Sequence, residues 1–250
     1  MKMLSDEKIE LHVIGCGDAF GSGGRLNTCF YIQTPEIGML LDCGATVLPS
    51  LKKQGIRTNQ IDFILLTHFH GDHYGGLPYF IMEASVYQRR KKLTIMSPPG
   101  AAEKIKTLLD LLYPGADAIE KLNLEFITYN EGECVTTDHF NLTPYKVIHT
   151  EAALPHGIRI QIGNKVISYS GDTSWTDNLI LLSQNSDLFI CECNFYSTRV
   201  KGHLCYQELE LKIPKLSCKR ILLTHLDEEM LRRGKDVKLE CATDGMKILI

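Results

Sequence analysis

Short apolar runs rich in β-branched residues alternate along the chain with segments in which apolar residues recur every three or four positions. The first pattern predicts buried strands, and the second predicts helices with one face toward a core. Strands are expected at residues 9–15, 28–33, 38–44, 61–67, 92–97, 124–129, 142–148, 158–163, 165–170, 187–192 and 220–225. Helices are expected at about 45–55, 76–90, 101–113, 176–184, 204–212 and 227–232. Because the two kinds of element stay interleaved, the pattern predicts stacked layers around buried sheets.

Two internal echoes occur within this order of elements. The letters ILLTH occur at 64–68 and again at 221–225, each time as an apolar strand that ends in Thr-His. A looser echo pairs MLLDCG at 39–44 with ISYSGD at 167–172, where each strand ends near an aspartate. Five matching apolar letters also arise by chance, but two echoes in the same order favour a duplicated half. A duplicated fold would bring the ends of corresponding strands to one edge, where a shared site can form.

The composition is that of a globular protein. With 250 residues the chain suits one large domain or two small ones, and no low-complexity or Pro/Ser-rich linker divides it. We therefore predict a single domain over residues 1–250. The hydrophobic fraction of 44% and the charged fraction of 23% are ordinary for globular domains. A net charge of −3 gives no overall attraction to nucleic acid or to an anionic membrane.

Neither export nor a membrane location is predicted. The opening letters MKMLSDEKIE lack the apolar core of a signal peptide. No apolar run approaches the roughly 20 residues that a membrane span needs. Nine irregularly spaced cysteines without a signal peptide indicate reduced thiols in a cytoplasmic protein. Cys191 and Cys193 are the closest pair, but CxC alone is a weak metal signal, so buried packing roles are expected for both.

The letters HFHGDH, directly after the first ILLT, crowd four potential metal ligands together. Histidine is the commonest ligand for zinc-like ions, and a carboxylate adds charge and can bridge two ions. In an extended segment His68 and His70 project to the same side. Gly71 is then expected to allow a tight reversal, so that Asp72 and His73 face a different point. This arrangement suits two adjacent metal sites better than one.

Two metal ions need further ligands, and the chain offers them at other strand ends. His149 ends PYKVIH, Asp172 follows KVISYSG, and His225 ends RILLTH. His149 is preferred to His156 because His149 terminates a strand, whereas Asp172 alone would also suit a turn or a helix N-cap. Asp42, in LLDCG, is expected to orient a ligating histidine.

The ordered set HxHxDH, a later His, GD and a final TH resembles the metallo-β-lactamase superfamily of binuclear metal hydrolases. Within it the likeness is greatest to the tRNase Z branch, whose glycine-rich turn, RN pair and GLP correspond to IGCGDAFGSGGRLN at 14–27 and GGLP at 75–78. The resemblance implies an α/β fold, a four-layer αββα sandwich with two mixed sheets. It also implies one ion on His68, His70 and His149, a second on Asp72, His73 and His225, and Asp172 bridging them.

The resemblance also implies a proton relay. The branch has a His-Glu-Ala-Thr box where this chain reads CECN, and a His-Ser-Thr box where it reads HLC, so only Glu192 and His203 match. In the family this Glu and His work together. Two divalent ions, with zinc preferred to manganese or iron, would then activate a bridging hydroxide as the nucleophile. Asp72 would orient the hydroxide, and His203 would protonate the leaving oxygen.

One departure from the branch limits the substrate. In tRNase Z a long arm that grips tRNA precedes the SGDT strand, whereas IRIQIGNKVISYSGDT crosses that gap with a Gly-Asn hairpin turn. The basic run QRRKK at 88–92 is expected to be a solvated helix end rather than a phosphate contact. We therefore expect a small or short phosphodiester as substrate, and neither tRNA nor a membrane as partner. Members of this branch are often dimers, which leaves a homodimer open.

Other functions stay open on the sequence alone. The same fold can serve an arylsulfatase or a lactonase, because substrate choice depends on the walls of the site, or a tRNA 3′-processing endonuclease without the arm. A di-iron redox protein would be expected to carry a flavin domain, for which this chain has no space. A binding protein without catalysis is disfavoured because all seven ligands are present.

Overall fold

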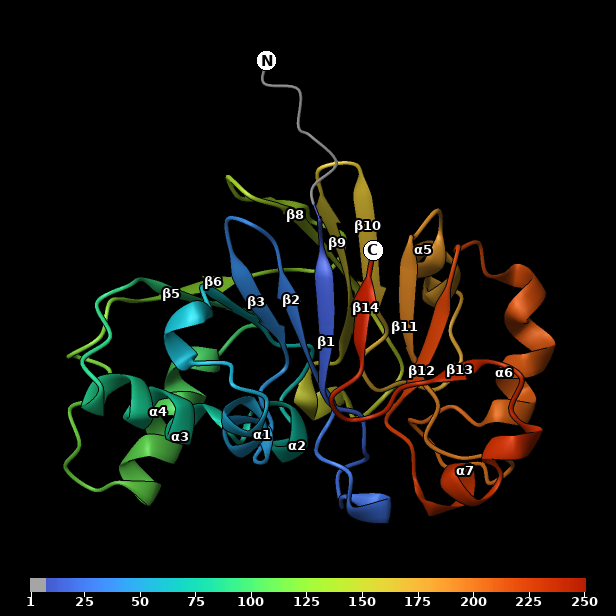
Figure 1. Ribbon diagram of the computed structural model, residues 1–250, viewed down its shortest axis with the longest axis horizontal. Helices are drawn as coiled ribbons and strands as arrows, with labels where there is room; N and C mark the ends of the chain where they lie inside the picture. Colours follow the sequence, from blue (N-terminus) through green and yellow to red (C-terminus); the bar gives the residue numbers. More distant parts are fainter. Residues whose placement is uncertain (1–7) are drawn as a thin grey trace.

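Two mixed sheets lie face to face at the centre of the computed structural model, which describes residues 8–250 (Figure 1). The first sheet has the order β14 (Lys247–Leu249), β1 (Glu10–Gly15), β2 (Cys29–Gln33), β3 (Gly38–Leu41), β4 (Phe63–Leu65), β5 (Leu93–Ser97) and β6 (Leu124–Thr128). The second has the order β13 (Glu240–Cys241), β12 (Ile221–Thr224), β11 (Leu188–Glu192), β10 (Lys165–Tyr169), β9 (His156–Ile162), β8 (Asn141–Lys146) and β7 (Val135–Thr136). Residues 1–7, on which much of the signal-peptide prediction rests, lie outside the described residues.

Helices cover the outer face of each sheet. The first sheet is covered by α1 (Val47–Lys53), α2 (Gly71–Tyr74), α3 (Leu77–Val86) and α4 (Ala101–Leu112). The second is covered by α5 (Asn178–Ser183), α6 (Tyr206–Lys212) and α7 (Glu228–Arg232). Short 3-10 turns lie at η1 (Ser22–Gly24), η2 (Thr58–Gln60), η3 (Glu151–Ala153), η4 (Ile213–Lys215) and η5 (Gly234–Asp236). Within residues 8–250 no helix is both long and apolar enough to cross a bilayer.

Three apolar clusters hold these four layers together. The central cluster joins the inner faces of the two sheets, with Leu41 of the first and Ile190 of the second both fully buried. The other two clusters lie between each sheet and its helices, around residues such as Phe80 and Leu209. Side chains alternate between the two faces of a strand, so each buried strand contributes to the centre and to an outer cluster. The αββα sandwich and its two mixed sheets are confirmed.

The two sheets repeat one order of strand directions. The pairs from β1 to β3 are antiparallel and those from β3 to β6 are parallel. The same order runs from β8 through β10 to β13. This repeat supports an internal duplication in which β3 corresponds to β10, as the looser echo indicates. The ILLTH echo is wrong as a marker of corresponding strands, because β4 adjoins β3 whereas β11 separates β12 from β10.

The predicted strands and helices all occur, with bounds shifted by a few residues. The elements that the pattern misses are α2, β7, β13 and β14, which have between two and four residues each. Segments this short contain less than two periods of any pattern, so periodicity cannot reveal them.

The basic run at 88–92 is exposed, as predicted, at every position except Arg89. Arg89 is only 5% exposed, and α3 ends before the run begins. Its guanidinium donates to the backbone carbonyls of Thr58, Ile61 and Lys92 at 2.7, 2.6 and 2.8 Å. The two lysines of the run form ion pairs with carboxylates of neighbouring segments. Arg89 therefore ties backbone segments together, because a buried guanidinium must satisfy several donors.

A plain hairpin joins β9 to β10. Ile162 pairs with Lys165 across the Gly163-Asn164 turn, and Gly163 has a φ of 56°, in the left-handed region that such turns need. The hairpin predicted here is confirmed, and it leaves no room for an inserted arm between these two strands.

Candidate metal centre and active site

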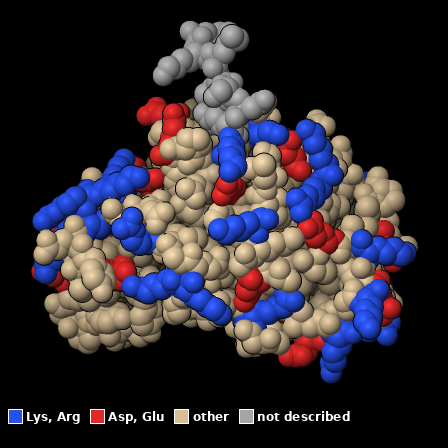
Figure 2. Space-filling model, viewed as in Figure 1, with Lys and Arg blue, Asp and Glu red and all other residues tan. Residues whose placement is uncertain are grey.

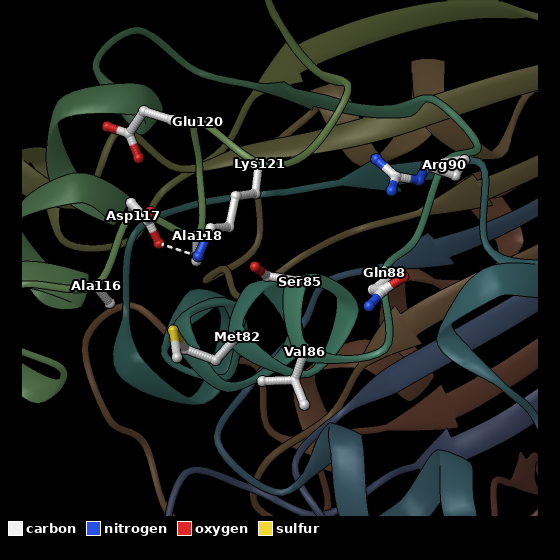
Figure 3. A pocket seen from close by; sticks show the side chains of 10 residues that line it. All are labelled: Met82, Ser85, Val86, Gln88, Arg90, Ala116, Asp117, Ala118, Glu120 and Lys121. Atoms are coloured by element: carbon white, nitrogen blue, oxygen red, sulfur yellow. Dashed lines mark ion pairs between the residues drawn. The ribbon is translucent and has the colours of Figure 1, made fainter.

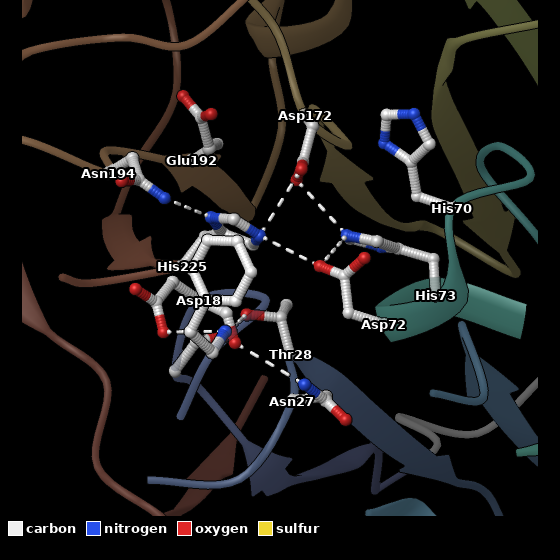
Figure 4. A network of polar contacts seen from close by, with 12 residues as sticks. Asp18, Asn27, Thr28, His70, Asp72, His73, Asp172, Glu192, Asn194 and His225 are labelled. Carbon is white, nitrogen blue, oxygen red and sulfur yellow. Dashed lines mark hydrogen bonds and ion pairs between the residues drawn. The ribbon is translucent and has the colours of Figure 1, made fainter. Parts of the chain in front are cut away.

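The predicted ligands come together where strands of both sheets end. His68 and His70 follow β4, whereas Asp72 and His73 lie on α2. The remaining three side chains follow strands of the second sheet, His149 after β8, Asp172 after β10 and His225 after β12. Figure 4 shows Asp72, His73, Asp172 and His225 pointing toward one another from elements far apart in the sequence.

Three histidines form the first group of candidate ligands. One ring nitrogen from each of His68, His70 and His149 lies within 4.8 Å of the others. Nε2 of His149 lies 2.9 Å from Nδ1 of His70. His156 is outside the group, and its Nδ1 donates instead to the carbonyl of Leu154 at 2.8 Å. The structure thus places His149, rather than His156, with the other two histidines.

The second group consists of Asp72, His73, Asp172 and His225. Nε2 of His73 lies 3.1 Å from Oδ2 of Asp72 and 3.3 Å from Oδ1 of Asp172. Oδ2 of Asp172 lies 3.2 Å from Nε2 of His225. The same oxygen lies 4.0 Å from Nε2 of His68 and from Nε2 of His149, which belong to the first group. Asp172 therefore stands between the groups, where a bridging carboxylate would stand.

Several buried atoms in these groups make no hydrogen bond of acceptable geometry, although other polar atoms of the groups lie close to them. These buried atoms include Nε2 of His68, Nε2 of His73 and Oδ1 of Asp172. An unpaired buried polar atom is costly, and native proteins keep few of them. Nitrogen and carboxylate oxygen atoms that converge on one space suit zinc, manganese or iron ions. The side chains present fit a bound metal, which would satisfy the unpaired atoms.

Asp42 orients two of the candidate ligands. Nδ1 of His73 donates to Oδ2 of Asp42 at 2.7 Å. Nδ1 of His68 lies 3.0 Å from the hydroxyl of Thr67, which itself donates to Asp42 at 2.9 Å. Fixing Nδ1 in this way directs Nε2 toward the metal space, as carboxylates do behind many metal-bound histidines. The position predicted for Asp42 is confirmed. The sequence does not reveal the part of Thr67, although Thr precedes His in both ILLTH segments.

The loop between β11 and α6 orients two more of the five rings, with a side-chain amide and a backbone carbonyl. The side-chain amide of Asn194 lies 2.6 Å from Nδ1 of His225. Nδ1 of His149 donates to the carbonyl of Gly202 at 2.7 Å. Gly202 has a φ of 91°, and a Cβ there would lie 2.7 Å from that same nitrogen. The sequence does not reveal either contact, except that Asn194 replaces the Thr of the family box.

Two residues of the site adopt left-handed backbone conformations that are rare outside glycine. Asp42 has a φ of 63° and His225 a φ of 59°. Each such conformation costs on the order of 1–3 kcal/mol and persists only where surrounding contacts enforce it. Both residues directly follow a strand, so the turn aims the side chain into the site instead of continuing the sheet.

Burial and nearby carboxylates shift the pKa values of the candidate ligand histidines in opposite directions. Burial lowers the pKa of His68, His70 and His149, which keeps these rings neutral with a lone pair available. Burial also acts on His225, but the carboxylates of Asp172 and Asp72 outweigh it and raise its pKa to about 9. The carboxylates thus make the second group a favourable place for positive charge.

The Glu192–His203 pair lies beside both groups. Glu192 is fully buried at the end of β11, where it accepts hydrogen bonds from Nδ1 of His203 and, at 2.7 Å, from the backbone N–H of Leu204. The His203 ring centre is 4.9 Å from that of His149 and 5.6 Å from that of His225. Burial lowers the pKa of His203, but its bond to Glu192 and the charge of that carboxylate outweigh burial and raise the pKa above its ordinary value.

Two glycines near the ligands differ in what they contribute. Asp72 and His73 join a different group from His68 and His70, as predicted. The turn, however, does not depend on the conformational freedom of Gly71, which begins α2 with a negative φ and where a Cβ would meet nothing within 4 Å. The turn is made instead by the start of a helix after the extended residue His70. Gly44 is the glycine that the site requires, because a Cβ on it would lie 1.8 Å from the carbonyl oxygen of Asp72.

We therefore expect Gly44→Ala to weaken metal binding about 10- to 100-fold, as changes behind a metal ligand commonly do. The new methyl group must push the backbone of Asp72 away, which moves Asp72 and His73 on α2 relative to Asp172 and His225. Gly71→Ala is the matched control and should bind zinc as the wild type does. Zinc titration of both purified variants measures the difference. Equal affinities for the two variants would show that the close approach at Gly44 does not position the ligands.

The cavity over the ligands is smaller than another hollow in the molecule. It has a volume of about 520 Å³ and lies between the glycine-rich loop after β1 and the loop after β11. The other hollow, of about 730 Å³, lies between the end of α3 and residues 116–121 (Figure 3). Its charged side chains include Asp117 and Lys121, which pair with each other at 2.6 Å, and its lining contains no histidine. Of these two cavities, the smaller one is lined by candidate metal ligands and the larger one is not.

Two solved structures share the fold of this chain. YhfI of Bacillus subtilis, described as a metallo-beta-lactamase fold protein, superposes with a TM-score of 0.80 over 97% of this chain and 100% of that chain, at 24% identity. Human tRNase Z, short form, superposes with a TM-score of 0.77 over 96% of this chain and 98% of that chain, at 20% identity. Fold and His/Asp cluster together define a metallo-β-lactamase-fold, metal-dependent hydrolase.

Sequence comparison narrows the class to a family. The profile described as "Anti-Pycsar protein Apyc1" matches residues 9–244, and the chain belongs to this family. Among its relatives, the probable metallo-hydrolase YhfI of Bacillus subtilis (strain 168) is 27% identical over 223 residues, which cover 87% of each chain. Ribonuclease Z of Methanothermobacter thermautotrophicus is 23% identical over 285 residues, covering 94% of this chain and 91% of the relative.

Proposed function

We propose that this protein hydrolyses a small phosphodiester with two divalent metal ions, zinc being preferred to manganese or iron. The observation that carries the proposal is the pair of neighbouring ligand groups with Asp172 between them, 4.0 Å from Nε2 of His68 and of His149, and with buried nitrogens that lack a hydrogen bond. One all-histidine group and one group rich in carboxylate make two adjacent cation sites, as in the two-metal hydrolases. The relative named ribonuclease Z supports a phosphodiester as the substrate.

Each ligand has a distinct part in this proposal. His68, His70 and His149 would hold one ion, and Asp72, His73 and His225 the other, with Asp172 shared. Ions bound there would supply a nucleophilic water at neutral pH and neutralise charge on the phosphoryl oxygens. Asp72 is 10% exposed, which lets its second oxygen orient that water. Hydrogen bonds between Asp42 and the His73 ring and between Asn194 and the His225 ring fix both rings, so neither ring has to reorient when metal binds.

His203 is the proposed general acid. Because Nδ1 of His203 bonds to Glu192, its Nε2 is free to face the substrate. His203 lines the same cavity as the ligands and is partly exposed, whereas Glu192 is buried and reaches the reaction only through His203. Glu192 is therefore a positioning residue that holds the ring and favours its protonated form.

The walls of the cavity support a small substrate with little charge. Lys201 is the single lysine or arginine that lines the cavity, among the residues that the structure describes. Asp18, Asp227 and Glu228 also line it and would repel a strongly anionic ligand. Lys and Arg are interspersed with Asp and Glu on the face seen in Figure 2, which gives no single basic field for a nucleic acid. The β9–β10 hairpin in place of an arm further supports a substrate other than tRNA.

A cytoplasmic location is part of the proposal. All nine cysteines are unpaired, as expected of proteins kept in a reducing compartment. Burial raises the pKa of the Cys191 and Cys193 thiols, which keeps them protonated and inert as packing residues.

Removal of metal should abolish activity, and its return should restore it. The chelated protein is expected to recover hydrolysis of bis(p-nitrophenyl) phosphate when two equivalents of zinc are added, with manganese and iron tested beside it. Elemental analysis should find two metal ions per chain. Aryl sulfate and lactone substrates, assayed in parallel, should be cleaved at least about 10²-fold more slowly than the diester. Binding of a single ion, or faster cleavage of the sulfate or the lactone, would overturn the proposal.

A further inference from the structure

The glycine-rich loop carries a phenylalanine that no neighbouring element covers. Phe20 is 95% exposed and lines the mouth of the cavity that contains the metal ligands. Single exposed apolar residues are common on protein surfaces, so exposure alone assigns no role. The position of Phe20 at the entrance to the reactive centre is the feature that calls for an explanation.

The loop holds Phe20 in place through backbone contacts on both sides. Oδ1 of Asp18 accepts hydrogen bonds from the backbone N–H groups of Phe20 and Ser22 at 3.2 and 2.9 Å. The N–H of Gly23 donates to Oε1 of Glu228 at 2.8 Å, which anchors the far side of the loop to α7. A loop tied in this way keeps the Phe20 ring at the cavity mouth, so a ligand that stacks on it need not order the loop.

Two further apolar side chains line the same cavity. Phe195 lines it with its ring centre 6.3 Å from that of His203, and Val200 lines it while remaining 40% exposed. We call Phe20, Phe195 and Val200 the apolar rim. The carboxylates beside this rim are already used, since Asp18 and Glu228 accept from the glycine-rich loop. The three side chains of the rim therefore offer a ligand apolar surface.

We propose that Phe20 is a specificity-determining residue that stacks on an aromatic or heteroaromatic ring of the substrate. This inference rests on the proposed function, because it takes the phosphodiester to lie over the metal ligands with one ester group reaching the rim. An aromatic ring gains most from such a contact, because two π-faces stack over a large area. Substrates with a short alkyl group in place of the ring would leave Phe20 in water.

The test uses two diesters that release the same p-nitrophenolate but differ in the other ester group. For the wild type, kcat/KM on bis(p-nitrophenyl) phosphate is divided by kcat/KM on methyl p-nitrophenyl phosphate to give an aryl preference. Phe20→Ala should reduce that preference about 5- to 30-fold, mainly through KM, and Phe20→Trp should retain it. Tyr87→Ala is the control, because Tyr87 is 73% exposed and lies outside this cavity. An aryl preference unchanged in Phe20→Ala would overturn the inference.

A binding experiment separates this inference from the proposed function. If the zinc-loaded wild type cleaves neither diester, the proposed function fails, and phenylphosphonate and methylphosphonate are then titrated into the same protein by calorimetry. Tighter binding of phenylphosphonate that depends on Phe20 would support the stacking role. Equal affinity for the two phosphonates, or a preference that Phe20→Ala retains, would overturn it.

Discussion

Asp172→Asn should lose both metal ions and reduce diester hydrolysis by at least about 10³-fold. The carboxylate of Asp172 is 2% exposed, and its oxygens approach histidines of both groups. An amide of the same shape removes the negative charge that the two proposed cation sites would share and places an NH₂ donor among ring nitrogens. Loss of several kcal/mol of charge stabilisation corresponds to a rate loss of this size.

The measurements are metal content and activity of the purified variant, together with thermal unfolding with and without zinc. Zinc should raise the melting temperature of the wild type, since a ligand that binds only the folded state stabilises it, but not that of Asp172→Asn. Asp62→Asn is the matched control. Asp62 is 8% exposed and bonds to Gly38 and Lys91 before β4 begins, away from the ligands. Two ions per chain in Asp172→Asn would contradict its bridging position.

The sequence predicts most of the ligand side chains because they lie at the ends of apolar strands. Strand ends of a layered fold meet at one edge, so the strand pattern, read together with the HFHGDH cluster, predicts that His68, His149, Asp172 and His225 lie near one another. The choice between His149 and His156 depends on the same rule. The HFHGDH motif holds its candidate ligands at short, fixed spacing, so the sequence alone shows that these side chains are neighbours.

The groups that aim the ligands cannot be predicted in the same way. The contact between Asn194 and His225 spans 31 residues, and that between His149 and Gly202 spans 53. The second of these contacts uses a backbone carbonyl, which every residue possesses, so no side-chain type signals it. Asp42 is the exception, because an Asp at a strand end near predicted ligands is a common partner of metal-bound histidine.

A prediction from local sequence is wrong where contacts with distant segments determine the environment of a residue. Basic neighbours favour a solvated helix end for Arg89, but its guanidinium reaches carbonyls about thirty residues away. The ILLTH echo matches strands that occupy different places in the two sheets, since an apolar strand ending in Thr-His satisfies the same local rule in either. Pairing of β14 with β1 joins the two ends of the described chain, a contact that no periodicity encodes.

His203→Ala should impair substrates with poor leaving groups far more than activated ones. An alkoxide must take up a proton as it departs, whereas p-nitrophenolate is stable as an anion. The ring of His203, fixed by Glu192 and close to the rings of His149 and His225, is the group that we propose to give that proton. Removal should cost about 10²- to 10⁴-fold in kcat on dialkyl phosphates and less than about 10-fold on bis(p-nitrophenyl) phosphate.

A second variant separates proton transfer from simple loss of packing. Glu192→Gln keeps a hydrogen bond to Nδ1 of His203 but removes the charge that favours its protonated form, so it should show the same leaving-group dependence to a smaller extent. His139→Ala is the control, because His139 is an exposed residue that contacts Glu36 outside the cavity. Rates for a series of diesters with graded leaving groups give the slope for each protein. Equal slopes in wild type and His203→Ala would exclude His203 as the proton donor. A steeper slope in His203→Ala, with an intermediate slope in Glu192→Gln, is the result that the proposed proton relay predicts.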